Sequence, residues 1–143
     1  MAGFDKIKLS KQLLRSVADL GYTNPKEIQQ KTLNRIIGGQ DVIAIGPEGS
    51  GKTTTYVLST LNRFNYAPEG VPKVLILVPE KEDVLSTIEK FESLNKNRSI
   101  SITGLYVTPG FESQMDALAE GADIVVATPD RARAIYLKLG LNL

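Results

Sequence analysis

Apolar side chains recur at helical spacing near the start of the chain. Between residues 10 and 20 they stand at Leu13, Leu14, Val17 and Leu20, the three- and four-residue spacing of one helix face. Ser10, just before them, is a favourable N-cap, so this pattern predicts a helix with one buried face over residues 10–20. A second helix is predicted from Asn24, as its N-cap, to residue 37, with Glu27 placed as in a capping box.

After residue 40 the pattern changes to short apolar runs that alternate with amphipathic segments. Strands are predicted at residues 41–45, 73–78, 100–107 and 123–127, and helices at 54–64, 82–94, 110–120 and 130–139. The run at 73–78 is unbroken, which is typical of a parallel strand covered on both faces. This alternation predicts an α/β fold with right-handed βαβ units and a mainly parallel central sheet. Loops starting at Gly46, Pro79, Thr108 and Thr128 are expected to meet at the carboxyl edge of that sheet.

Composition narrows the possible chemistry. The chain has 143 residues, 42% of them hydrophobic and 23% charged, which suits one globular domain. Seventeen basic and 16 acidic residues leave a net charge of +1, so no overall basic field indicates nucleic-acid binding. Cysteine and histidine are absent, which excludes disulfides, thiol catalysis and imidazole catalysis. No apolar run approaches the roughly 20 residues that span a bilayer, and we expect an intracellular protein, cytoplasmic or nuclear, with no membrane contact.

One motif indicates specific chemistry. Residues 46–53 fit the pattern G-x-x-x-x-G-K-[ST] through Gly46, Gly51, Lys52 and Thr53. Small residues here, Gly49 and Ser50 among them, allow backbone N–H groups to face a polyphosphate, and Thr54 follows at the helix start. Lys52 adds a positive charge, and the Thr53 hydroxyl can bind Mg²⁺. Alone, this motif is shared by many kinases and ATPases.

A second motif points to a family. The sequence Gly-Tyr-Thr-Asn-Pro-Lys-Glu-Ile-Gln at residues 21–29 resembles the Q motif of DEAD-box RNA helicases, and Phe4 stands where that family places an isolated aromatic. Residues 39–46, 114–118 and 121–129 are also similar to the family. The resemblance implies that Gln29 recognises the adenine of ATP and that Phe4 stacks on it. An amide suits this role because it donates and accepts hydrogen bonds simultaneously.

The resemblance also implies a domain organisation. It makes residues 1–143 part of the first RecA-like domain, a three-layer P-loop NTPase fold that is incomplete at its carboxyl end. Residues 1–38 would form the Q-motif helical region and residues 39–143 the P-loop core. The Asp-Glu-Ala-Asp motif and the second RecA-like domain of the family would lie beyond residue 143. We therefore expect no catalytic residue here other than Lys52, and ATP binding at most.

Several positions depart from the family pattern. Lys26 replaces a hydroxyl residue, and Glu48 replaces a threonine within the phosphate loop. RNA contacts are implied for Pro79, Thr128, Pro129 and Arg131. Asp130 stands where the family has glycine, and its carboxylate is expected to repel RNA phosphate.

Three hypotheses follow from these residues. In the first, the chain is the ATP-binding part of an RNA helicase that couples ATP and Mg²⁺ to duplex opening or ribonucleoprotein remodelling. In the second, it belongs to an inactive helicase-like module that acts as a nucleotide-dependent RNA clamp or scaffold. The third is an unrelated P-loop kinase or ATPase. Asp123 and Asp130 flank the apolar run at residues 124–127, and either could be taken for the metal-binding aspartate of such an enzyme.

Overall fold

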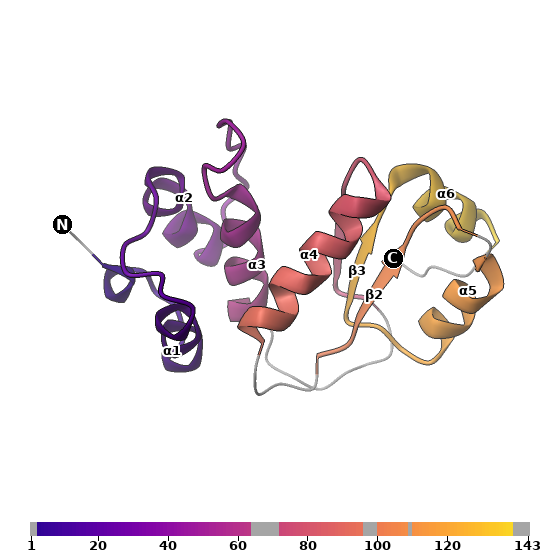
Figure 1. Cartoon of the computed structure of the whole chain (residues 1–143), viewed down its shortest axis with the longest axis horizontal. Helices are drawn as coiled ribbons and strands as arrows, with labels where there is room; N and C mark the ends of the chain where they lie inside the picture. Colours follow the sequence, from indigo (N-terminus) through magenta and orange to yellow (C-terminus); the bar gives the residue numbers. More distant parts are fainter. Residues whose placement is uncertain (1–2, 64–71, 96–99, 109, 139–143) are drawn as a thin grey trace. The chain divides into compact units, whose positions relative to one another are not determined.

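The computed structural model of the chain describes residues 3–63, 72–95, 100–108 and 110–138. The chain groups into two compact units, and each is described by itself. The first comprises Met1–Asn65 and Lys90–Lys96, and the second comprises Tyr66–Glu89 and Asn97–Leu143. Figure 1 follows their elements in chain order by colour.

The described part of the first unit is helical. Its elements are the short 3-10 helix η1 (Phe4–Lys6), the helices α1 (Lys11–Asp19), α2 (Glu27–Ile37) and α3 (Lys52–Arg63), and the end of α4 (Lys81–Leu94) from Lys90 onward. Helices α1 and α2 both contact α3. Each presents buried apolar side chains at helical spacing, namely Leu13, Val17, Leu33, Val57, Leu58 and Leu61. The apolar periodicity of the sequence therefore does correspond to buried helix faces.

The start of α1 agrees with the prediction, whereas the start of α2 does not. Ser10 is the N-cap of α1, and its hydroxyl accepts a hydrogen bond from the N–H of Leu13 at 3.3 Å. Helix α2 was predicted to be capped by Asn24, but its N-cap is Lys26 and its first residue is Glu27. The side chain that reaches back to the N-cap N–H is Gln29, at 2.8 Å. The cap therefore lies two residues later than predicted.

Two asparagines fix the segment between η1 and α1. The Asn34 side-chain oxygen, on α2, accepts from the N–H of Lys8 at 2.8 Å. The Asn62 side chain, on α3, accepts from the N–H of Ser10 at 2.9 Å and donates to the carbonyl of Lys8 at 3.3 Å. These bonds satisfy backbone groups that have no helical partner. They hold the segment that follows Phe4 against the two main helices of the unit.

The strand predicted at residues 41–45 is not present. These residues adopt neither helix nor strand, and the side chains of Ile43 and Ile45 are 92% and 91% exposed. A strand needs a neighbouring strand to pair its backbone groups, and the strands that the structure describes all lie in the second unit. The apolar run thus has the composition of a strand, and the described residues of its own unit offer no strand to pair with it.

The second unit contains a three-stranded parallel sheet. Its strands are β1 (Val74–Leu77), β2 (Ile102–Leu105) and β3 (Ile124–Ala127), in the order β1-β3-β2. Ile124 is in register with Val74 on one side and with Ile102 on the other. Every residue of the central strand β3 is buried. The predicted parallel sheet is confirmed, with shorter strands than the apolar runs suggested.

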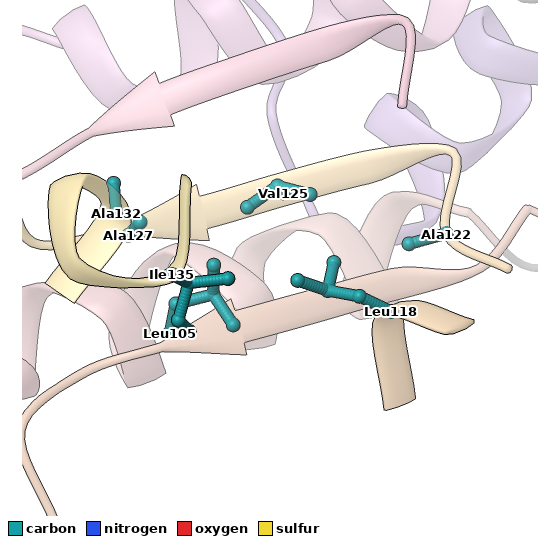
Figure 2. Close-up of a cluster of buried hydrophobic side chains, with 7 residues drawn as sticks. All are labelled: Leu105, Leu118, Ala122, Val125, Ala127, Ala132 and Ile135. Carbon is teal, nitrogen blue, oxygen red and sulfur yellow. The ribbon is translucent and has the colours of Figure 1, made fainter. Parts of the chain in front are cut away.

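Helices pack on both faces of this sheet. They are α4 (Lys81–Leu94), whose residues up to Glu89 belong to this unit, α5 (Phe111–Ala119) and α6 (Pro129–Leu137). A β-carbon at Gly104 of β2 would lie 2.8 Å from the side chain of Ile88 and 3.0 Å from that of Val84, so α4 approaches the strand closely at this glycine. Leu105, the next residue, points to the opposite face. There it joins the buried cluster shown in Figure 2, with side chains from β3, α5, α6 and the connection before β3: Leu118, Ala122, Val125, Ala127, Ala132 and Ile135.

Candidate functional site

The first unit contains a cavity of about 650 Å³. Its lining comes from η1, from residues 21–26 before α2, from α2 itself, from the phosphate loop and α3, and from one residue of α4. The lining residues are Phe4, Gly21, Tyr22, Thr23, Asn24, Lys26, Gln29, Glu48, Gly49, Gly51, Lys52, Thr53, Thr54 and Lys90. The cavity therefore brings together most of the residues that the sequence predicts to bind nucleotide. Gly46 and Ser50 belong to the same loop without bordering the cavity.

The phosphate loop depends on its glycines. Gly49 and Gly51 have φ values of +82° and +96°, a conformation that side-chain-bearing residues adopt only with strain. A β-carbon at Gly51 would lie 2.7 Å from the side-chain nitrogen of Gln29, and one at Gly46 would lie 2.8 Å from the Ser50 hydroxyl. The loop thus passes closer to Gln29 than any other residue type would allow.

Helix α3 begins directly after this loop, at Lys52. Because the first N–H groups of an α-helix have no acceptor within the helix, those at Lys52, Thr53 and Thr54 are available to an anion. The Lys52 ammonium donates to the carbonyl of Gly46, which brings its charge back over the loop. The side chains of Lys52 and Thr53 are both exposed. This arrangement can hold phosphate groups, and the Thr53 hydroxyl is accessible to a bound cation.

The Ser50 side chain supports this interpretation of the loop. Its hydroxyl oxygen is buried and makes no hydrogen bond to another described residue. A buried polar atom without a partner costs free energy unless a ligand or water supplies one. The loop therefore carries, besides its helix N–H groups, a hydroxyl that has no partner among the described residues.

Gln29 holds the cavity wall and the loop together. The residue is buried, its side-chain oxygen accepts from the N–H of Lys26 at 2.8 Å, and its side-chain nitrogen donates to the carbonyl of Gly51 at 3.4 Å. A glutamine amide carries two N–H donors and an oxygen with two lone pairs. One donor and one lone pair therefore remain for a ligand, which is the pair of functions that an adenine edge requires.

Aromatic and cationic side chains form another part of the wall. Phe4 is buried in η1 and still borders the cavity. The Lys90 ammonium donates to the Tyr22 hydroxyl at 2.8 Å and lies 5.4 Å from the centre of that ring. Tyr22, Lys26 and Lys90 were not predicted as site residues. Lys26 was noticed only as a departure from the family pattern, and nothing in the sequence connects Lys90 to this motif.

The predicted RNA-binding residues lie in the second unit and are arranged differently from the expectation. Arg131 is buried, donates to the carbonyl of Thr108 at 2.9 Å and lies 5.0 Å from the centre of the Phe111 ring. Thr128 is buried, whereas Pro79 and Pro129 are exposed. The charge of Arg131 is therefore used within the unit, where it joins the loop after β2 to α6.

Asp130 and Asp123 have different environments. Asp130 is exposed, and the nearby Thr128 hydroxyl and then the Arg131 N–H, which donates to it at 2.9 Å, hold the pKa of its carboxyl below the ordinary 3.8. Asp123 is buried, and its carboxylate accepts from the backbone N–H of Ser101 at 2.9 Å and from its hydroxyl at 3.3 Å. It precedes β3, whereas metal-binding aspartates of P-loop enzymes follow a strand. Asp123 therefore acts as a structural link between the starts of β2 and β3.

The described residues offer neither a clustered metal site nor a membrane-spanning helix. Among them, no three or more acidic side chains gather into a group that could hold a metal ion. None of their helices combines the length and the apolar composition that crossing a membrane requires. The loops that start at Pro79, Thr108 and Thr128 do follow parallel strands in register, and Arg131 joins two of them. The expected convergence with the loop at Gly46, which belongs to the first unit, stays a prediction.

Comparison with known proteins places these features in a family. Residues 26–142 match the family described as DEAD/DEAH box helicase. The ATP-dependent RNA helicase dbp10 of Aspergillus clavatus is 33% identical over 142 residues, which cover 99% of this chain and 15% of that protein. The ATP-dependent RNA helicase DeaD of Klebsiella pneumoniae is 34% identical over 130 residues, which cover 90% of this chain and 20% of that protein.

A solved structure is similar along the whole chain. The crystal structure of a DEAD box protein from the hyperthermophile Methanococcus jannaschii has a TM-score of 0.92 and 27% sequence identity, covering 99% of this chain and 38% of that one. The parallel sheet and the helices on its faces are thus those of a RecA-like domain fragment. The chain spans 15% and 20% of the length of the two relatives named above. With most of its residues matched, the chain belongs to the DEAD/DEAH box helicase family.

Proposed function

We propose that the cavity of the first unit binds ATP and that the chain is the nucleotide-binding part of an ATP-dependent RNA helicase. One observation carries the proposal. Gly51 and Lys52 of the phosphate loop border the same cavity as Phe4 and Gln29, which stand far earlier in the sequence. A generic phosphate loop needs neither of these two residues, whereas an adenine-selective site needs groups of both kinds.

The phosphate loop and the start of α3 hold the polyphosphate. The backbone N–H groups of Gly49 and Gly51 and those of the first helical turn donate to its oxygens. The Ser50 N–H leaves the Pro47 carbonyl, to which it donates at 3.2 Å, and the Lys52 ammonium leaves the Gly46 carbonyl, and both join them. The Thr53 hydroxyl would supply a ligand to Mg²⁺, which would offset part of the phosphate charge. The chain thereby neutralises the charge of the nucleotide mainly through backbone dipoles and one lysine.

Gln29 and Phe4 hold the base. The remaining N–H and lone pair of Gln29 pair with the ring nitrogen and the amino group of adenine, and Phe4 contributes an aromatic surface. Guanine presents a carbonyl where adenine has its amino group, so one of the two hydrogen bonds is lost. Selectivity for ATP over GTP follows from this difference.

In the whole protein, ATP binding and hydrolysis are coupled to RNA. The similar proteins are named ATP-dependent RNA helicases, and the full-length protein would supply the hydrolytic motif and a second RecA-like domain. RNA would contact the carboxyl edge of the sheet at Pro79, Thr128, Pro129 and Arg131. Since the Arg131 guanidinium is bonded to Thr108, a second candidate is a catalytically inactive helicase-like module that acts as a nucleotide-dependent RNA clamp or scaffold. RNA-stimulated ATP hydrolysis by the full-length protein would decide for the helicase and against the clamp.

The binding experiment compares ATP with GTP on the 143-residue chain. We expect saturable ATP binding by calorimetry in the presence of Mg²⁺, and weaker GTP binding. Lys52→Ala should weaken ATP binding at least about tenfold, because a charge-assisted contact contributes about 1.5–3 kcal/mol. Absence of saturable ATP binding to a folded chain would refute the proposal.

A matched pair of variants separates the two roles of Gln29. Gln29→Ala removes the helix cap and the amide together, whereas Gln29→Glu retains an oxygen to accept from the Lys26 N–H and removes both donors. We expect both variants to lose the preference for ATP over GTP, and only Gln29→Ala to lose the cap, worth about 1 kcal/mol. An unchanged ATP preference in the two variants would show that Gln29 does not recognise the base.

A further inference from the structure

A lysine outside the phosphate-loop motif reaches into the phosphate loop. Lys26 is the N-cap residue of α2, and its ammonium donates to the carbonyl of Gly49 at 2.6 Å. Its aliphatic stem runs beside Gly51, where a β-carbon would lie 3.3 Å from the Lys26 Cδ. Lys26 thus extends along the loop that would hold the phosphates, from a different element of the fold.

The position of Lys26 explains an otherwise unfavourable residue. Glu48 lies in the loop next to Gly49, and both Glu48 and Lys26 border the cavity. A carboxylate beside bound phosphate weakens binding by like-charge repulsion. The charged side chains that line the cavity are Lys26, Glu48, Lys52 and Lys90, and of the three lysines Lys90 is bonded to Tyr22. Lys26 and Lys52 both donate to carbonyls of the loop that carries Glu48.

An ammonium group has capacity beyond the bond to Gly49. It carries three N–H donors and no acceptor, so one donor can remain on the carbonyl while two face a ligand. The side chain is exposed, and its movement toward an anion displaces no buried group. By contrast, a short hydroxyl side chain at this position would carry no charge.

We propose that Lys26 is a second phosphate-binding lysine of this site, which contacts the polyphosphate of the nucleotide and offsets the charge of Glu48. The proposal rests on the proposed binding of ATP in this cavity. It assigns a binding role to a residue that departs from the family pattern, and it links that departure to the one at Glu48. Relative to the family pattern, Lys26 adds one positive charge and Glu48 adds one negative charge, so the net charge of the cavity is unchanged.

The test is a double-mutant cycle on the 143-residue chain. ATP and adenosine are competed against a fluorescent ATP analogue for the wild type, Lys26→Thr, Glu48→Thr and the double variant. We expect Lys26→Thr to weaken ATP binding about tenfold and to leave adenosine binding unchanged, since adenosine has no phosphate. Glu48→Thr should strengthen ATP binding several-fold, and the double variant should return to within about twofold of the wild type.

Two controls complete the design. Lys31→Thr removes the same charge from an exposed position of α2 that does not border the cavity, and ATP affinity should not change. Lys26→Arg keeps the charge and should retain most of the affinity. Urea unfolding of each variant establishes that it is folded.

The possible results have distinct meanings. If Lys26→Thr binds ATP within twofold of the wild type while Lys52→Ala still weakens ATP binding, the role of Lys26 is overturned and the ATP site stands. Equal losses for ATP and adenosine also overturn it, because they assign Lys26 to holding the loop and Gln29 in place. If the wild type binds no ATP, the proposed function and this inference fail together.

Discussion

Gly51 gives the sharpest test of how the site is assembled. Replacement by alanine imposes a left-handed conformation at φ +96° on a residue with a side chain, which costs about 1–2 kcal/mol. The new methyl group would lie 2.7 Å from the side-chain nitrogen of Gln29, so that the amide must move. Movement breaks its bond to the Lys26 N–H and removes the cap of α2, worth about 1 kcal/mol. The expected total for Gly51→Ala is about 2–3 kcal/mol of lost stability.

Gly49 supplies the matched control. Its φ is +82°, and a β-carbon there would meet no atom within 4 Å. Gly49→Ala should therefore cost only the conformational strain, about 1–2 kcal/mol. The assay is urea unfolding of the chain, followed by circular dichroism. In a Gln29→Ala background the clash is absent, and Gly51→Ala should then cost about as much as Gly49→Ala. Equal costs of the two glycine substitutions in the wild-type background would refute the contact between the loop and Gln29.

Three further predictions concern other parts of the chain. Arg131→Met should destabilise the second unit by about 1–3 kcal/mol, because the Thr108 carbonyl loses its donor. Arg133→Met, at an exposed position of α6, should change the stability by less than about 0.5 kcal/mol. Urea unfolding of both variants checks these values. Because the folded pKa of Asp130 is lowered, its contribution is fully present above the unfolded pKa near 3.8 and is lost as the pH falls through the folded value. The wild type should therefore lose more stability on acidification below pH 3.8 than Asp130→Asn, and identical pH dependence of the two would contradict the hydrogen bonds assigned to this carboxylate. Asn62→Ala should remove two hydrogen bonds to the segment that follows Phe4. It should weaken the binding of ATP more than the binding of inorganic triphosphate, which has no base. Equal effects on both ligands in competition measurements would rule out this positioning role.

The helices could be predicted because their signals are local. Ser10 and the four apolar positions that follow it lie within eleven consecutive residues. Ser10 caps α1 as the pattern indicates, Leu13 and Val17 are buried, and Leu14 and Leu20 are half-buried. The same holds for the phosphate loop, where the spacing of Gly51 and Lys52 is itself the signal. Strand pairing is different, because it depends on partners distant in sequence. The run at residues 41–45 has the composition of a strand, yet the sequence does not say whether a neighbour is present to pair with it.

The roles of charged residues were harder to predict for a related reason. Arg131 has the same sequence context whether it faces RNA phosphate or the Thr108 carbonyl, and only the folded chain brings Phe111 and Thr108 beside it. Asp123 stands just before β3, and Ser101, whose N–H donates to its carboxylate, stands just before β2. The two residues meet only because β2 and β3 pair. Lys26 could be recognised as unusual from the sequence, but its contact with Gly49 depends on how the loop folds back toward α2.

The central claim is that ATP occupies the cavity of the first unit. Titration of the isotopically labelled chain with ATP and Mg²⁺, followed by amide chemical shifts, tests it most directly. The account predicts saturable shifts at Phe4, Gln29 and the loop residues Gly49, Gly51 and Lys52, which are lost in Lys52→Ala. Saturable shifts confined to the second unit, or none at ATP concentrations that saturate related helicases, would contradict it.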